Sequence, residues 1–320
     1  MADLLYSKAG DFTPLKEEDL RMQTAALRPV AANFVANIRR LHSVWVLLPH
    51  LVELSCVNIV RLTESIFALT GKPFLTSQEE KNHELMKKVH EKLWGDIEER
   101  AKSQNISLVQ ASGYDFKRGL ERFDELLGTI PQLKDWSAPA LAQQVLSAWT
   151  AFEVLSVDLW ISALNESPQN LVVAFTKKPE RDQEKSVPIS AIQTVGYDLR
   201  HSMGTILRNT GRASFISLSS TRRVYEKTFG SELPPVFHDE NLRLLELVRN
   251  LFAHRAGGVD ETFLRDITSV KHPFGVLQLG QALELNGPIV RDFCLSAMTR
   301  GQELAMFVDN WLQRNATAKF

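Results

Sequence analysis

Cysteine is scarce in this sequence of 320 residues, which contains only Cys56 and Cys294. The two cysteines lack the close spacing of metal ligands, so a cysteine-based metal site is excluded. We expect two buried free thiols in a reducing compartment rather than a disulfide. The short motifs of nucleotide and metal chemistry are missing too: there is no Walker sequence, no HExxH, no GxSxG, and no GxGxxG after a strand. We therefore expect no metal and no cofactor.

Long apolar runs and an excess of charge of one sign are also absent. The most apolar stretch, residues 44–60, is interrupted by Pro49, His50, Glu53 and Asn58, and it is too short and too polar to cross a bilayer. The N-terminus has no basic region followed by an apolar one, as a signal peptide would have. The formal net charge is −1, so any contact with nucleic acid must come from a local patch. A soluble cytoplasmic protein without a membrane partner is expected.

Helical periodicity dominates what is present, and strand-like alternation is nearly missing. The pattern predicts an all-α protein, with one extended or hairpin-like stretch at residues 276–287 and a polar loop at 176–186. A soft boundary near Asp135 separates an N-terminal helical region of unknown role, residues 1–134, from a helical bundle of residues 135–320. The expected helices span residues 15–27, 30–48, 51–69, 77–103, 114–127, 137–167, 190–208, 219–229, 239–254 and 288–313.

Two of these helices carry an unusual arrangement of polar side chains. On a helical wheel of residues 239–254, leucines, Val248 and Phe252 form a broad apolar face. Arg243, Glu246, Asn250 and His254 lie on the polar side, with Asn250 and His254 one turn apart. In the helix of residues 138–166, Glu153 projects between Trp149 and Trp160. A carboxylate among aromatic rings needs a cation.

We expect that cation to be Arg249, with Glu153 buried. For the pair of Glu153 and Arg249, a purely structural role and an active-site role are equally favoured. Asp158 is expected on the solvated side of its helix. The histidines at the polar surface of the 77–103 helix, His83 and His90, favour a solvated face over a metal site.

The stretch RNLFAH, Arg249 to His254, resembles the signature of the HEPN superfamily (higher eukaryotes and prokaryotes nucleotide-binding). That signature is an arginine, usually a polar residue directly after it, and a histidine, with four to six residues between arginine and histidine; Arg249, Asn250 and His254 match it. The surrounding sequences AWTAFEVLSVDLW, SSTRRVYEKTF and AHRAGGVDETFL also resemble the family. The resemblance covers residues 135–313. It implies a HEPN-like bundle, commonly dimeric, that often acts as a metal-independent endoribonuclease in toxin–antitoxin or anti-phage systems.

The implied reaction is attack of an RNA 2′-hydroxyl on the adjacent phosphorus. His254 would transfer protons, Arg249 would hold the phosphate, Asn250 would orient either of them, and Glu153 would fix the arginine. A homodimer through the helix of residues 239–254 would supply a second histidine. The expected partners are RNA, a second copy of the chain, and an antitoxin or defence protein. A non-catalytic module that binds RNA or protein is the alternative, since some members of the family do not cut RNA.

Arginines are concentrated around the signature. Ten lysines and arginines stand against seven acidic residues between Arg200 and Arg265. This local surplus indicates a rim for phosphates, and ordinary helix-surface arginines are an equally good reading. The expected RNA contacts are Arg208, Arg212, Arg222, Arg223, Arg243 and Arg255.

Overall fold

The computed structural model describes residues 12–52, 58–72, 75–108, 131–172, 175, 187–197, 199 and 201–315. Over these residues the protein is all-α, as predicted, and the only extended pairing is an isolated antiparallel bridge between Gly258 and Ala282. The expected helix of residues 114–127, the loop of 176–186 and Cys56 lie outside the described residues.

The chain forms two compact units. The larger unit consists of residues 10–43 and 140–320, and the smaller one includes residues 44–139. This division differs from a boundary at residues 134/135, because residues 10–43 belong to the same unit as the C-terminal half of the chain.

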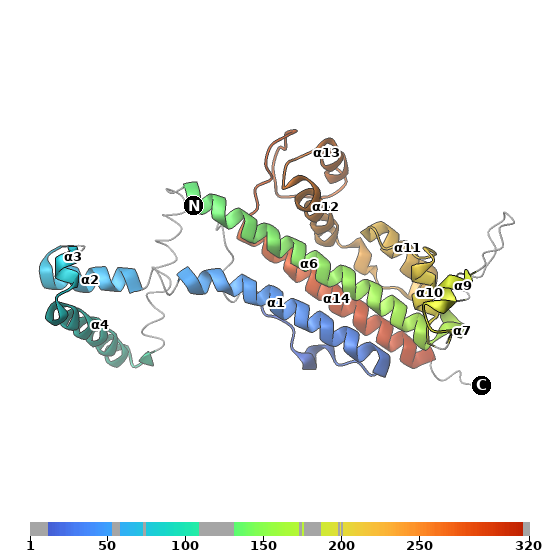
Figure 1. Ribbon diagram of the computed structural model, residues 1–320, viewed down its shortest axis with the longest axis horizontal. Coiled ribbons are helices and arrows are strands. Elements are labelled where there is room, and N and C mark those ends of the chain that lie inside the picture. The colour runs from blue at the N-terminus through green and yellow to red at the C-terminus, as the bar shows by residue number, and fades with distance from the viewer. Residues whose placement is uncertain are drawn as a thin grey trace. The chain divides into compact units, whose positions relative to one another are not determined.

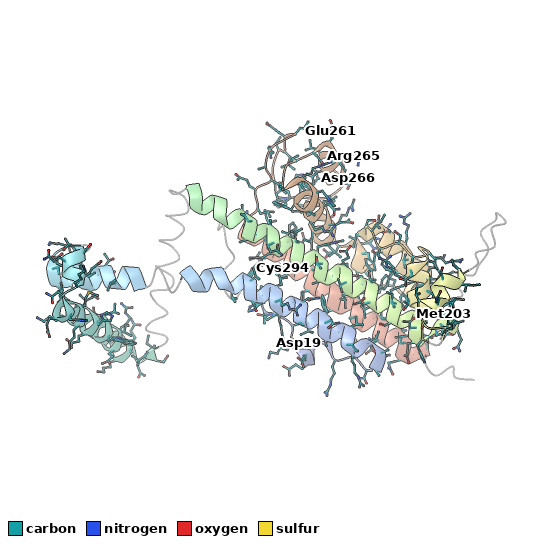
Figure 2. The ribbon with its side chains drawn as sticks, in the orientation of Figure 1. Asp19, Met203, Glu261, Arg265, Asp266 and Cys294 are labelled. Atoms are coloured by element: carbon teal, nitrogen blue, oxygen red, sulfur yellow. The ribbon has the colours of Figure 1, made fainter. Side chains whose placement is uncertain are left out.

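Three long helices run side by side in the larger unit, which holds residues 28–43 of α1 (Arg28–Val52), residues 140–166 of α6 (Pro131–Glu166) and all of α14 (Gly287–Asn315) (Figure 1). Gly301 of α14 lies close to both other helices: an added Cβ would lie 2.4 Å from the ring of Phe34 in α1 and 3.0 Å from Leu155 in α6. Cys294 of α14 is a buried free thiol, as expected, and burial raises its pKa (Figure 2). The fully buried side chains of Trp160, Phe152 and Phe293 fill the core between these helices and those that cover them.

Shorter helices complete the larger unit. Their order along the chain is α7 (Pro168–Leu171), α9 (Ile189–Gln193), α10 (Met203–Asn209), α11 (Leu218–Phe229), α12 (Glu240–Arg255) and α13 (Glu261–Ile267), with 3-10 turns η4 (Gly230–Glu232) and η5 (Pro235–His238) between α11 and α12. The predicted bounds of α11, α12 and α14 are confirmed to within two residues. The buried ring of Tyr225 ties α11 to α6, since its hydroxyl donates to the Ser156 carbonyl at 2.6 Å.

One predicted helix near the N-terminus is wrong. Residues 15–27 form only two 3-10 turns, η1 (Glu17–Leu20) and η2 (Ala25–Leu27). The buried carboxylate of Asp309 in α14 accepts the backbone amides of Gln23 and Thr24 at 2.7 and 2.8 Å, so these amides are not available to a continuous helix. Leu20, Met22 and Thr24 are buried at every second position, which is the spacing of an extended chain.

Two predicted helix ends are wrong, at residue 48 and at residue 137, because both helices extend past these positions. Helix α1 continues through Pro49 to Val52, and α6 begins at Pro131 and runs through Pro139, eight residues beyond its start. A proline inside a helix removes one backbone hydrogen bond, and its ring crowds the carbonyl four residues earlier, so it disfavours a helix without forbidding it.

The predicted helix of residues 190–208 is broken in two. Gly196, Tyr197 and His201 have positive φ angles, which separate α9 from α10. Helix α10 then packs directly on α6. Gly204 permits this contact because it has no side chain: an added Cβ would lie 2.4 Å from the carbonyl oxygen of Ile161.

The extended stretch at residues 276–287 does not pair with itself. Its partner is the segment after α12: the Val259 amide donates to the Gln281 carbonyl at 2.9 Å, and the Leu283 amide donates to the Gly257 carbonyl at 2.9 Å. The short helix α13, which the sequence pattern missed, lies between the two paired segments. Its N-cap is Asp260, whose side chain accepts the Phe263 amide.

The smaller unit contains α2 (Asn58–Thr70), α3 (Ser77–Glu80) and α4 (His83–Gln104). The predicted capping box at Ser77 and Glu80 is displaced by one residue, to Thr76 and Glu79. It caps only the four residues of α3. A second cap, Asn82, accepts the amides of Glu84 and Leu85 and starts α4 anew, so the expected single helix of residues 77–103 is two helices.

By length and composition, one described stretch, Ala138–Glu166 in α6, is apolar enough to cross a bilayer. Half of its most apolar window is buried against other helices, which is also how the core helix of a bundle is placed.

Candidate functional site

Helix α12 carries the RNLFAH signature and is held at both ends. Its N-cap, Asp239, accepts the Leu242 amide at 2.8 Å, the Ser296 hydroxyl at 2.7 Å and the Arg300 Nε at 2.9 Å. Burial raises the pKa of the Asp239 carboxyl, but these hydrogen bonds together lower the pKa below its usual value. Ser296 and Arg300 belong to α14, so one ionised carboxylate fixes the start of α12 on the bundle. At the other end, Ala256 adopts a left-handed conformation and ends the helix.

The apolar face of α12 matches the helical wheel. Leu244, Leu245, Leu247, Val248 and Leu251 are all buried, while Phe252 is half-buried. The wheel failed at Glu246, which was placed on the polar side of the helix. Only 2% of Glu246 is exposed.

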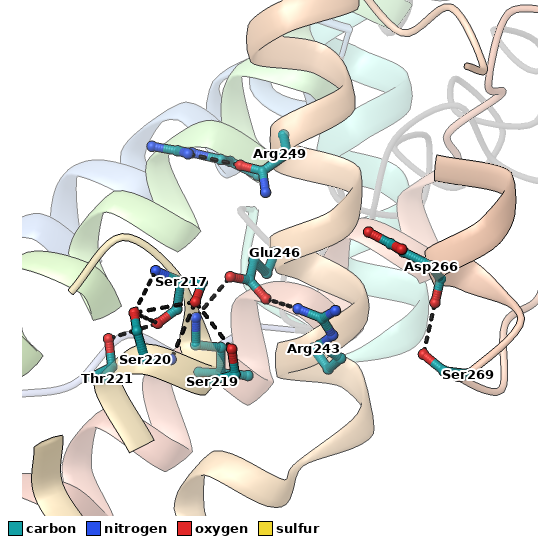
Figure 3. A network of polar contacts seen from close by, with 11 residues as sticks. Ser217, Ser219, Ser220, Thr221, Arg243, Glu246, Arg249, Asp266 and Ser269 are labelled. Atoms are coloured by element: carbon teal, nitrogen blue, oxygen red, sulfur yellow. Dashed lines mark hydrogen bonds and ion pairs between the residues drawn. The ribbon is translucent and has the colours of Figure 1, made fainter. Parts of the chain in front are cut away.

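Glu246 performs a structural task that the sequence pattern did not reveal. Its carboxylate accepts the Leu218 amide at 2.7 Å and pairs with Arg243, and thereby joins α12 to the first turn of α11 (Figure 3). Nothing in a single sequence distinguishes a carboxylate that caps a neighbouring helix from one on a solvated face.

Glu153 and Arg249 are brought together as predicted. Glu153 Oε2 of α6 lies 3.5 Å from Arg249 Nη2 of α12, and the exposed fractions of the two side chains are 31% and 27%. The expected full burial of Glu153 is therefore wrong: the carboxylate lies at the edge of the aromatic stripe, where solvent still reaches it. Arg249 Nη1 also donates to Asn250 Oδ1 at 2.8 Å, so the three side chains form a continuous chain from α6 to α12 (Figure 3 shows Arg249).

Asp158, on the same helix as Glu153, is not on a solvated face. It is half-buried, and burial raises the pKa of its carboxyl. Burial and the charge of Asp158 also raise the pKa of Tyr225. The expectation for Asp158 failed because α11 covers that side of α6, which a wheel of α6 alone does not show.

His254 is exposed in the last turn of α12, one turn beyond Asn250. Together with Asn250 it borders a cleft of about 280 Å³ between α12 and α13, called the His254 cleft below. Within the described part of the chain, no hydrogen bond or ion pair joins His254 to another side chain, and no group of three or more His, Cys, Asp or Glu residues is arranged to hold a metal ion. An exposed imidazole beside a cleft can exchange protons with a bound molecule.

The six arginines expected to contact RNA do not line one cleft. Arg255 borders the His254 cleft, but its Nε lies 3.1 Å from Asp260. Arg222 and Arg243 border a different cleft, of about 320 Å³, next to His238.

Most of these arginines also have partners within the protein. Arg222 lies 3.5 Å from Glu226 and donates to His238 Nε2 at 3.2 Å, and Arg208 lies over the ring of Phe215. The Nε of the exposed Arg223 donates to the Ser219 carbonyl of its own helix at 3.4 Å, and Arg212 is half-buried after α10.

Comparison with known proteins found no relative of this chain. No protein-family model, curated protein or solved structure matches the chain. The arrangement of Glu153, Arg249, Asn250 and His254 is therefore assessed on its own chemistry.

Proposed function

We propose that the larger unit is a metal-independent endoribonuclease of the HEPN type, with Arg249, Asn250 and His254 as its site. One observation carries the proposal: within a turn and a half of α12, an arginine held by a carboxylate precedes an exposed histidine that has no protein partner within the described residues. Such a pair provides a cation for a phosphate and a group that transfers protons.

The reaction that suits these groups is internal cleavage of RNA. The 2′-hydroxyl loses its proton and attacks phosphorus, the bond to the 5′-oxygen breaks, and that oxygen takes up a proton. The products are a 2′,3′-cyclic phosphate and a 5′-hydroxyl. His254 is the candidate for proton transfer. Arg249, which has N–H groups beyond those that face Glu153 and Asn250, is the candidate for binding the non-bridging oxygens.

A second copy of the chain would complete this mechanism. The reaction needs both a base and an acid, and one chain offers one such histidine. An isologous dimer through α12 would place two copies of His254 at one site. In this proposal the protein acts in the cytoplasm without a cofactor, in a toxin–antitoxin, stress or phage-defence setting, and a separate antitoxin or defence protein controls it.

The competing function is a helical module that binds RNA or protein without cutting it. The ion pairs of the arginines favour it, since Arg243, Arg249 and Arg255 each lie beside a carboxylate and these pairs also serve the fold. Both functions share the same structure, so only an activity measurement separates them.

The test is incubation of the purified protein with total RNA in EDTA, comparing wild type with His254→Ala. His90→Ala is the matched control, since His90 is an exposed histidine on α4. We expect wild type and His90→Ala to cut equally, and His254→Ala to be slower by about 10²–10⁴-fold. Cleavage by His254→Ala at the wild-type rate would contradict the proposed role, and absence of cleavage by the wild type under all conditions would favour the binding module.

A further inference from the structure

The His254 cleft contains apolar and acidic side chains that have no role in the proposed phosphate chemistry. Its depth is apolar, formed in part by Leu251 and Phe263, of which 3% and 4% are exposed. Asn250 and His254 border it on α12, and Asp266 borders it on α13. Its volume of about 280 Å³ is near the lower end for small-molecule pockets, a size that suits one flat ring system.

The cleft also presents hydrogen-bond acceptors on α13. Asp260 is committed to the protein, since it accepts the Phe263 amide at 2.8 Å and pairs with Arg255 at 3.1 Å. Asp266 has more capacity. Its Oδ1 accepts from Arg265 Nε at 2.8 Å, whereas no contact within the described residues occupies Oδ2. Figure 3 shows the Asp266 carboxylate on the side of α13 that faces α12.

An apolar slot with a carboxylate at its edge matches the chemistry of a nucleobase. In single-stranded RNA an unstacked base can leave the stack, lie against a protein surface and be read along its Watson–Crick edge. A carboxylate accepts hydrogen bonds and offers none. Guanine presents two adjacent donors there, N1–H and the N2 amino group, whereas the single donor of uracil lies between two carbonyl oxygens that a carboxylate repels.

We propose that the His254 cleft is a base-binding subsite that prefers guanine, with the Asp266 carboxylate as the acceptor that selects it. The inference rests on the proposed function, because His254 would then act on the phosphate next to the bound base. It adds a sequence preference to a site whose other groups contact only the RNA backbone.

Binding of uncleavable oligonucleotides tests the preference without requiring catalysis. Two short labelled 2′-deoxy oligonucleotides, one of uracil bases alone and one with a single central guanine, are titrated with the full-length protein. We expect wild type to bind the guanine-containing strand about tenfold more tightly, a discrimination typical of one bidentate contact to a base. Asp266→Asn should reduce the ratio to within twofold. Arg265→Ala, which removes the ion-pair partner of Asp266 but keeps the acceptor, should retain it.

Equal binding of the two strands by wild type, or an unchanged ratio in Asp266→Asn, would overturn the inference. A cleft that instead receives a cationic side chain of a partner protein would give equal binding. If Asp266→Asn does not fold, a competition experiment on the wild type replaces this variant. Guanosine monophosphate is then expected to displace the guanine-containing oligonucleotide more strongly than uridine monophosphate does. Cleavage of the matching ribo-oligonucleotides is scored separately. His254-dependent cleavage without a guanine preference rejects the subsite alone, whereas a guanine preference without cleavage rejects the proposed catalysis alone.

Discussion

Separate replacement of Glu153 and Arg249 should reveal a modest coupling between them. Removing one partner of a fully buried ion pair costs about 3–5 kcal/mol, which is the magnitude expected if Glu153 were buried among its aromatic neighbours. In the structure the closest N–O distance is 3.5 Å, and the two side chains keep 31% and 27% of their surface exposed. Exposed pairs contribute about 0.2–1 kcal/mol, and the partial burial of this pair places it near the top of that range. We therefore expect a coupling free energy of about 1 kcal/mol.

A double-mutant cycle measures this quantity. Glu153→Gln, Arg249→Ala and the double variant are unfolded in urea, and the departure from additivity is the coupling. Each single variant should remain folded and melt within a few degrees of wild type, since about 1 kcal/mol corresponds to about 2–4 °C for a protein of this size class. A coupling above about 3 kcal/mol would show that the pair behaves as a buried one and would refute the reasoning from exposure. A loss of cleavage in Arg249→Ala could then be a folding defect.

Other contacts make equally specific predictions about stability. Glu246→Ala should lower the free energy of unfolding by about 1–3 kcal/mol because the buried Leu218 amide loses its acceptor, and Glu246→Gln, which keeps an acceptor, should cost less in the same denaturation assay. Burial raises the pKa of Asp158, so its stabilising neutral form is fully present below the unfolded pKa of about 4 and is lost as pH rises through the folded pKa. Asp158→Asn should therefore melt higher than wild type at pH 7 and at the same temperature below about pH 4; a lower melting temperature at pH 7 would contradict the burial. Gly204→Ala should cost about 1–3 kcal/mol, because its Cβ would lie 2.4 Å from the carbonyl oxygen of Ile161; unchanged stability would show that α10 can move away from α6.

The parts of the fold that the sequence predicted correctly are those governed by local chemistry. Helix α12 has an apolar face with helical periodicity, and the bounds predicted for it, residues 239–254, differ from the observed ones by one residue at each end. The pairing of Glu153 with Arg249 was also predicted correctly, although Glu153 lies at the edge of its aromatic neighbours and is not buried among them.

Three of the errors arise where a distant segment decides the local structure. Residues 15–27 have a helical pattern, but the Asp309 carboxylate of α14, nearly 300 positions away in the chain, takes two of their backbone amides. Glu246 was assigned to a polar face because the start of α11, which it caps, cannot be located from its own helix. The His254 cleft was missed for the same reason: its second wall is α13, a short helix with no long hydrophobic period.

The most direct test of the central claim is a cleavage assay with two matched RNA oligonucleotides in EDTA. One is all-ribose, and the other carries a single 2′-deoxyribose at the position where the first is cut. The proposed chemistry predicts that wild-type protein cuts the first strand to give a 2′,3′-cyclic phosphate and leaves the second intact at that position, and that His254→Ala cuts neither at a comparable rate. Cleavage of the deoxy-substituted strand at the same bond, a 5′-phosphate product, or activity that EDTA abolishes would contradict it.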